Sequence, residues 1–268
     1  MTRVLITGAA GHIGRALRQG LHGRYDLRLA DIAPQAAARE REEIVTVDIR
    51  RYDEVRAAME GIDVVVHLAG IPDEDSWQKI RDMNIDGCYN VFEAAREAGV
   101  KRVVFASSNH AVGFHRRDRL LNDAVALRPD SRYGVSKVFG EGLGRLYADK
   151  YGLSVACLRI GSFRPDDAPT APRHLFTWIS HRDMVQLVRR CIDHSGYHFL
   201  IAYGVSGNAR NRWDNANVRW LGYAPEDDAE QYAAKIAATG QLEDEREALF
   251  HGGFGCLVEF EGELSRID

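Results

Sequence analysis

The chain has 268 residues, which suits one α/β domain with a small elaboration better than two full domains. Its net charge of −4 gives no reason to expect a nucleic acid or an anionic membrane as partner. The four cysteines lie far apart, which favours reduced thiols in a cytoplasmic protein over disulfides or a metal site. We expect neither a signal peptide nor a membrane span, since the chain begins in a predicted strand and its apolar runs are short.

The first residues of the chain predict a phosphate-binding turn. An apolar strand over 3–7 is followed by a glycine turn and then by a helix over 15–21. The turn contains three glycines, Gly8, Gly11 and Gly14. Backbone N–H groups at such a helix start face an anion, and the glycines allow a pyrophosphate to approach closely. A second strand ends in Asp31, about 20 residues farther on, where a carboxylate can bind both hydroxyls of an adenosine ribose.

The later elements alternate as they do in proteins with a parallel sheet. Further strands are predicted at 44–47, 63–68, 103–106, 155–160 and 199–203. Further helices are predicted at 53–60, 80–98, 133–151, 181–191 and, in a charged stretch, 229–247. We therefore predict an α/β fold of the NAD-binding Rossmann type, a doubly wound parallel sheet with helices on both faces. Residues 1–160 should mainly bind the cofactor, and 161–268 should form a small C-terminal lobe on the substrate side, packed by Trp213 and Trp220.

The cofactor site is expected at the glycine turn and at the carboxyl ends of the strands, where open α/β sheets bind ligands. The expected cofactor-binding residues are Gly8, Gly11, His12, Ile13, Gly14, Asp31, Asp48, Ile49, Leu68, Ala69, Gly70, Tyr133, Lys137 and Ser162. Asp31 would repel a 2′-phosphate, so we expect NAD⁺ to be preferred to NADP⁺. Arg28 would weaken this preference if its side chain reached the ribose.

A tyrosine and a lysine spaced for one helical face are the candidate catalytic groups. Tyr133 and Lys137 lie four residues apart at the start of a predicted helix. A free tyrosine has a pKa near 10, so a tyrosine base needs a positive charge nearby, and Lys137 can supply it. Ser108 follows the predicted strand at 103–106 and can hydrogen-bond the substrate oxygen. No metal is expected in this chemistry.

The glycine turn, Asp31, Ser108 and the Tyr133/Lys137 pair resemble the extended short-chain dehydrogenase/reductase superfamily over residues 1–165. Segments 105–113, 128–137, 159–162, 177–178 and 213–215 are similar to the bacterial uronate dehydrogenases along nearly the whole chain. The resemblance implies NAD-dependent oxidation of a hexuronic acid, galacturonate or glucuronate, at C1 to an aldaro-lactone. It also implies that Tyr133 is the base, and that Ser108, Asn109 and His110 contact the sugar.

The resemblance further implies an arginine that binds the substrate carboxylate. Arg173 is our candidate, because it precedes 177–178 at the family's spacing, and Arg164 is the competitor. The chain departs from the family at Phe163, where relatives carry Cys, and at Pro72, near where a substrate-contacting Ser is expected. These departures bear on substrate preference more than on cofactor or mechanism.

Two other functions remain open at this point. A nucleotide-sugar epimerase or dehydratase of the same superfamily would need more chain after residue 160 to bury a nucleoside diphosphate. A non-catalytic NAD-sensing regulator would usually have lost the tyrosine or the lysine, and both are present. The expected partner is a small sugar acid. The glycine-rich stretch 251–255 could fold over the pocket or form the contacts of a homo-oligomer.

Overall fold

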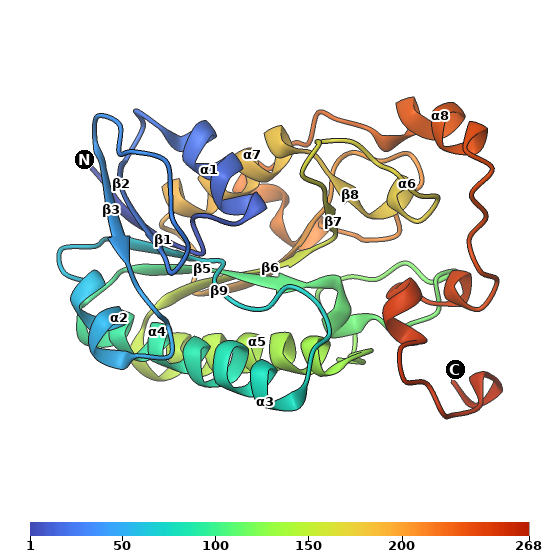
Figure 1. Cartoon of the computed structure of the whole chain (residues 1–268), viewed down its shortest axis with the longest axis horizontal. Coiled ribbons are helices and arrows are strands. Elements are labelled where there is room, and N and C mark those ends of the chain that lie inside the picture. Colours follow the sequence, from blue (N-terminus) through green and yellow to red (C-terminus); the bar gives the residue numbers. More distant parts are fainter. Residues whose placement is uncertain (268) are drawn as a thin grey trace.

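The fold is built on one long parallel sheet, seen in a computed structural model that describes residues 1–267. Within these residues seven parallel strands lie in the order β3-β2-β1-β4-β5-β6-β9 (Figure 1). Their bounds are Arg3–Thr7 (β1), Asp26–Asp31 (β2), Glu42–Thr46 (β3), Val64–His67 (β4), Arg102–Ser108 (β5), Ser154–Ile160 (β6) and Phe199–Gly204 (β9). The strand order reverses between β1 and β4, which opens a crevice at their carboxyl ends. The predicted Rossmann-type fold is confirmed.

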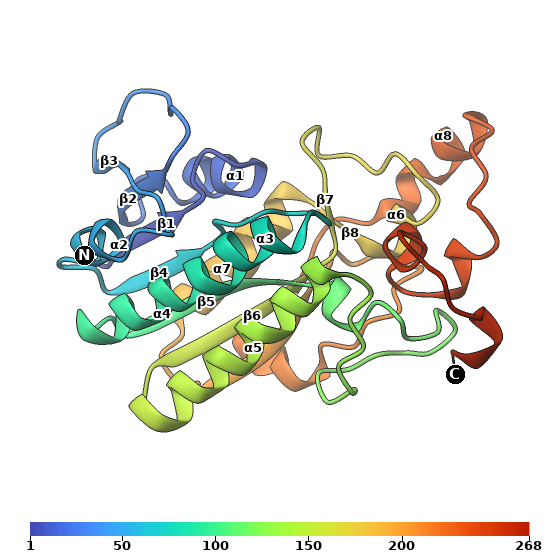
Figure 2. The same ribbon diagram turned by 60° about the horizontal axis from the view of Figure 1, so that its bottom comes forward.

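Helices cover both faces of the sheet, as Figures 1 and 2 show. One face carries α1 (His12–Leu21) and α7 (His181–Asp193). The other face carries α2 (Tyr52–Ala58), α4 (Gly87–Glu97) and α5 (Arg132–Tyr151). Each helical layer encloses its own apolar core against the sheet. Because both faces are covered, the central strands have no polar face, which is the reason for the valine run in β4.

The predicted single helix over 80–98 is divided into three parts. The chain forms α3 (Trp77–Ile80), then a π-helical turn, η1 (Arg81–Asp86), and then α4. Asn84 lies in the π-helical turn and is buried. Its amide accepts from the Ile71 backbone N at 2.8 Å and donates to Ser136 Oγ at 3.1 Å. The turn thus ties the loop after β4 to α5, directly beneath the crevice.

The C-terminal lobe lies beyond the carboxyl ends of the strands (Figure 2). It includes the short strands β7 (Ser162–Phe163) and β8 (Trp178–Ile179) and the short helix α6 (His174–Thr177). Single turns complete the chain at η2 (Asn109–Val112), η3 (Ala216–Leu221), η4 (Ala229–Tyr232), η5 (Glu247–Leu249), η6 (Gly253–Cys256) and η7 (Leu264–Arg266). No helix within residues 1–267 is long and apolar enough to cross a membrane.

Two predictions for this lobe are wrong. The charged stretch 229–247 is helical only as far as α8 (Ala233–Ala238), because Gly240 follows in a left-handed conformation, φ 67°, that ends the helix. Trp213 is fully buried in the lobe, as predicted. Trp220 is instead 49% exposed and meets the ring of His194, just after α7, edge-on at 4.9 Å. Trp220 therefore packs at the end of α7 and not within the substrate lobe.

Candidate active site

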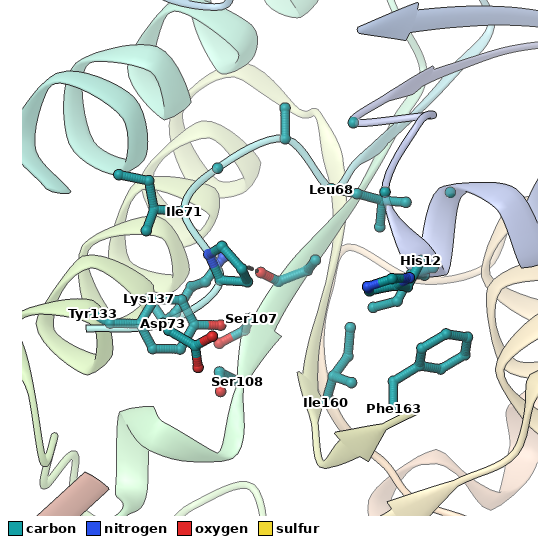
Figure 3. Close-up of a pocket in the computed structure, with 18 of the residues that line it drawn as sticks. His12, Leu68, Ile71, Asp73, Ser107, Ser108, Tyr133, Lys137, Ile160 and Phe163 are labelled. Atoms are coloured by element: carbon teal, nitrogen blue, oxygen red, sulfur yellow. Dashed lines mark hydrogen bonds between the residues drawn. The ribbon is translucent and has the colours of Figure 1, made fainter. Parts of the chain in front are cut away.

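A pocket of about 730 Å³ opens at the carboxyl ends of the strands. It runs from the glycine turn to the C-terminal lobe, so that one end can hold a nucleotide and the other a small substrate. All the predicted site residues except Asp48 line it. Figure 3 shows two groups of side chains facing each other across the space: Asp73, Ser107, Ser108, Tyr133 and Lys137 on one side, and His12, Leu68, Ile160 and Phe163 on the other.

Asp48 itself turns away from the pocket, although its neighbours Val47 and Ile49 line it. Its carboxylate forms an ion pair with Arg50 at 2.6 Å and accepts the Arg50 backbone N at 3.0 Å. The hydrogen bonds to Arg50 lower the pKa of Asp48. A cofactor role for Asp48 stays a prediction.

The glycine turn has the geometry of a phosphate cradle. Gly8 has φ 74°, and a Cβ there would lie 2.7 Å from the backbone N of Ala69. A Cβ on Gly14 would overlap the carbonyl of Gly8, so a side chain is excluded at both positions. The first turn of α1 has no side-chain cap, since its N-cap residue is Gly11. Its N–H groups therefore remain available to an anion, which fits the pyrophosphate of NAD.

Asp31 is held at the edge of the same cradle. One carboxylate oxygen accepts the Ala10 backbone N at 2.9 Å, and the other accepts the Ala33 backbone N at 2.8 Å. The remaining lone pairs can accept ribose hydroxyls. Arg28 points away from this position, because its guanidinium binds Glu43 Oε2 at 2.8 Å and the Ala58 carbonyl at 2.8 Å. The positive charge of Arg28 therefore does not reach the position that a 2′-phosphate would occupy.

Tyr133, Lys137 and Ser108 come together at the centre of the pocket (Figure 3). Tyr133 and Lys137 lie on one face of α5, and Lys137 Nζ is 5.3 Å from the centroid of the Tyr133 ring. Lys137 is fixed there by donating to the carbonyl of Ala106 at 2.8 Å. Ser108 is the last residue of β5 and lines the pocket beside Tyr133. The structure thus brings together the three groups that sequence motifs predicted.

The electrostatics of this centre hold the tyrosine as a neutral phenol. Burial raises the pKa of Tyr133, and the carboxylate of Asp73 raises it further, while the nearby hydroxyl of Ser108 lowers it. Burial also lowers the pKa of Lys137 to about 8. A tyrosine base here depends on positive charge close to the phenol, so the lysine beside it has a direct chemical use.

Two carboxylates, a half-buried Glu74 and a buried Glu141, fix the elements that carry the candidate catalytic residues. Glu74 accepts the backbone N of Tyr133 at 2.9 Å and so anchors the start of α5. Glu141 accepts from Ser107 Oγ at 2.6 Å and forms a buried ion pair with Arg159 at 2.9 Å. The hydrogen bond from Ser107 to Glu141 holds the end of β5, where Ser108 lies.

Arg173 lies at the substrate end, held by polar groups that are all neutral. Its Nε and Nη2 donate to the carbonyl of His251 at 3.1 and 2.6 Å. The side-chain oxygen of Asn109 accepts from Nη2 of Arg173 at 2.8 Å. The amide nitrogen of Asn109 donates to the Ile160 carbonyl at 3.1 Å. Nη1 makes only a long contact to Ser162 Oγ, 3.4 Å. The Nε–Nη2 edge is thus occupied by the protein, and Nη1 is the donor left for a ligand.

The charge of Arg173 is not matched by a carboxylate. Burial and the nearby charge of Arg117 lower the pKa of Arg173 to about 10, so it is cationic at neutral pH. Among residues 1–267 no Asp or Glu forms an ion pair with it. Arg164 also lines the pocket, and its buried Nε has no hydrogen-bond partner among residues 1–267. Burial, with the charges of Arg164 and Arg173, lowers the pKa of His174 to about 4, as expected if the cations gather at this end.

Several site residues escaped the sequence motifs. Asp73 lines the pocket beside the catalytic group (Figure 3), within the polar loop after β4. Phe163, which the sequence did mark as a departure from the family that bears on substrate preference, lines the pocket and stacks on His181 with ring centroids 4.6 Å apart. His251, far along the chain, supplies the carbonyl that positions Arg173. The stretch 251–255 therefore folds back onto the substrate end, which was one of its two predicted roles. No group of three His, Cys, Asp or Glu side chains in the described part of the chain could hold a metal ion.

Comparison with known proteins agrees with this site. The NAD dependent epimerase/dehydratase family matches residues 4–182. A uronate dehydrogenase from Pseudomonas putida is 41% identical over 94% of each chain. A mutant uronate dehydrogenase from Agrobacterium tumefaciens has been solved in complex with NAD and is 40% identical to this chain. The two structures align over 96% of this chain and 97% of the mutant enzyme, with a TM-score of 0.91. A glucuronic acid dehydrogenase from Chromohalobacter salexigens is 36% identical over 99% of each chain, with a TM-score of 0.92.

These matches extend over nearly all of the chain, and the fold, the glycine turn and the Tyr133/Lys137 pair are in place. The chain is an NAD-dependent dehydrogenase. It belongs to the NAD dependent epimerase/dehydratase family and, within it, to the uronate dehydrogenases.

Proposed function

We propose that this chain oxidises a hexuronic acid, galacturonate or glucuronate, at C1 and releases the aldaro-lactone. The observation that carries this proposal is the unpaired cation Arg173 in the same pocket as Tyr133 and Ser108. A buried guanidinium without a carboxylate partner is costly, so an anionic substituent on the substrate stabilises it. A sugar whose C6 is a carboxylate can place that group on Arg173 and its C1 hydroxyl on Tyr133.

The residues divide the reaction between them. Ser108 hydrogen-bonds the C1 oxygen and orients it toward Tyr133. Tyr133 accepts the C1 hydroxyl proton, and the charge of Lys137 stabilises the phenolate needed for this step. Bound NAD⁺ would supply the hydride acceptor for C1, held by the glycine turn and by Asp31. The substrate is a cyclic hemiacetal, so loss of the C1 hydroxyl proton to Tyr133 and of a hydride from C1 gives the lactone directly.

The two ends of the chain take different parts in this proposal. Residues 1–160 mainly bind the cofactor, and residues 161–268 mainly serve the substrate side, as the positions of the glycine turn and Arg173 support. We place the protein in the cytoplasm, which fits its four buried free thiols. The substrate is its small-molecule partner.

Turnover of matched sugars tests the proposal. The protein is incubated with NAD⁺ and with galacturonate, glucuronate, galactose, glucose, glucose 6-phosphate or a UDP-sugar, and NADH absorbance is followed. We expect turnover of the uronates and at least about a hundredfold lower kcat/KM for galactose and glucose, because these lack the anion that binds Arg173. Equal efficiency with neutral aldoses would overturn the uronate assignment. Activity with a UDP-sugar alone would favour the epimerase or dehydratase alternative.

A further inference from the structure

His110 and Asp130 form a hydrogen-bonded pair beside the catalytic tyrosine. Nδ1 of His110 lies 2.7 Å from Oδ2 of Asp130. The His110 ring meets the Tyr133 ring edge-on, with centroids 5.8 Å apart. The Asp130 side chain is fully buried, whereas the His110 side chain is 23% exposed and lines the pocket. The pair therefore links the closed interior to the place where the sugar would react.

The Asp130 carboxylate occupies a space that glycines leave open. A Cβ atom on Gly113 or on Gly252 would overlap Oδ2 of Asp130, and one on Gly134 would lie 3.2 Å from Oδ1. The backbone N of Asp130 also donates to the carbonyl of His110 at 3.3 Å. Segments from three parts of the chain thus leave room for this one carboxylate, and they fix its direction toward the histidine ring.

The pairing determines which ring nitrogen carries the proton. A carboxylate accepts hydrogen bonds, so Nδ1 of His110 is the donor to Asp130. In the neutral ring the other nitrogen, Nε2, is then an acceptor. Within residues 1–267, Nε2 of His110 has no hydrogen-bond partner. It is an available acceptor in the same pocket that holds the donor groups of Arg173.

We propose that Asp130 is a positioning residue, which holds His110 so that Nε2 accepts a hydrogen bond from a hydroxyl group of the substrate beside the reacting carbon. The inference rests on the proposed function only for the identity of the ligand as a sugar. Together with Arg173, the pair gives the pocket both kinds of polar group: hydrogen-bond donors for a carboxylate and an acceptor for a hydroxyl.

The position of the proton is measured directly in the wild-type protein, without substrate. Long-range ¹H–¹⁵N spectra of ¹⁵N-histidine-labelled protein distinguish a protonated ring nitrogen from an unprotonated one, and His110→Ala assigns the signals. We expect Nδ1 of His110 to be protonated and Nε2 unprotonated at neutral pH. A proton on Nε2 would overturn the proposal. This NMR measurement does not depend on the folding of any Asp130 variant.

Kinetics test whether Asp130 acts through His110. We expect Asp130→Ala and His110→Ala each to raise KM for the uronate about tenfold, as loss of one hydrogen bond predicts, with the NAD⁺ Kd unchanged. The double variant should be no worse than the worse single variant, since both remove the same contact. Additive losses would show that Asp130 has an independent structural role. Asp118→Ala, an exposed carboxylate in the same segment, is the control and should keep the wild-type KM.

Monodeoxy uronates identify the group that His110 binds. One of them should be turned over equally by the wild type and by Asp130→Ala, because it lacks the hydroxyl that Nε2 accepts. If Asp130→Ala impairs every monodeoxy substrate by the same factor, the hydroxyl contact does not exist. Failure of the wild type to oxidise any uronate would instead remove the proposed function, while the NMR result would still decide the state of His110.

Discussion

The ammonium of Lys137 lies beside the ring of Tyr133, with Nζ 5.3 Å from the ring centroid, and is fixed there by the carbonyl of Ala106. Because Lys137 is buried, its charge acts on the phenol with little screening by water. Replacing it by Ala should therefore lower both turnover and cofactor affinity, as expected for a group that serves the phenolate and the nicotinamide ribose.

Tyr133→Phe should abolish turnover and leave NAD⁺ binding largely intact. The ring still fills its buried place, but no oxygen remains to accept the proton. General-base catalysis contributes typically about 10²–10⁴-fold, so kcat should fall by at least about a hundredfold. The control is Tyr151→Phe at the exposed end of the same helix, which should behave as the wild type. Activity of Tyr133→Phe within about threefold of wild type would place the base elsewhere.

Local patterns in the sequence were sufficient to predict that the candidate catalytic groups lie together. Tyr133 and Lys137 share a helical face because they are four residues apart, and Ser108 lies at the edge of the sheet because it ends a strand. The Arg173 environment could not be predicted in this way. Its position depends on the carbonyl of His251, which approaches only through tertiary folding.

Two predicted helices differ from the structure for separate physical reasons. Helical composition over 229–247 did not produce a helix beyond Ala238, since the stretch lacks an apolar face to bury. The division of the helix over 80–98 follows from the buried amide of Asn84, which binds Ile71 and Ser136 rather than solvent. The first outcome follows from the local chain, with Gly240 in a left-handed conformation, and the second from contacts between distant segments.

Asp73→Asn should move the pH dependence of kcat/KM to lower pH. The Asp73 carboxylate raises the pKa of Tyr133, so removing its charge makes the phenolate less unfavourable and lowers that pKa. The activity of a tyrosine base rises as pH increases through its pKa. The rising part of the kcat/KM pH profile should therefore shift to lower pH. Asp73 is exposed, so we expect a shift of only a fraction of a pH unit.

Asp75→Asn is the matched control for this shift. Asp75 lies in the same loop but pairs with Lys79 at 3.0 Å and does not line the pocket. Its pH profile should superimpose on that of the wild type. A rising limb that is unmoved in Asp73→Asn, or moved equally in both variants, would contradict the electrostatic role of Asp73.

Glu141→Ala should destabilise the fold. It removes the only carboxylate paired with the buried Arg159 among residues 1–267, and it frees Ser107. Leaving one partner of a buried ion pair uncompensated costs about 3–5 kcal/mol in the free energy of unfolding. Urea unfolding measures this loss. Glu230→Ala breaks an exposed pair with Arg210 and should change the midpoint little. Equal effects of the two substitutions would refute the role of Glu141.

Asp31 should set the preference for NAD⁺ over NADP⁺. Its carboxylate is held at the ribose end of the cradle by the Ala10 and Ala33 backbone N–H groups, where it would repel a 2′-phosphate. Asp31→Ala should bring the ratio of kcat/KM with NAD⁺ to kcat/KM with NADP⁺ closer to one. Arg28→Ala should leave this ratio unchanged, because the Arg28 side chain is bound to Glu43 on the other side of the strand. Equal efficiency of the wild type with both cofactors would remove the prediction.

Arg173→Lys tests the carboxylate site against its competitor, Arg164. A lysine ammonium cannot bind the His251 carbonyl and still present a planar donor group to a carboxylate, so we expect kcat/KM for galacturonate to fall by about a hundredfold or more. The low efficiency with galactose should hardly change, since that sugar has no carboxylate to lose. The two rates, measured side by side by NADH absorbance, therefore converge in Arg173→Lys. In Arg164→Lys they should stay apart as in the wild type. If convergence occurs in Arg164→Lys instead, Arg164 binds the carboxylate and Arg173 only supports the pocket wall.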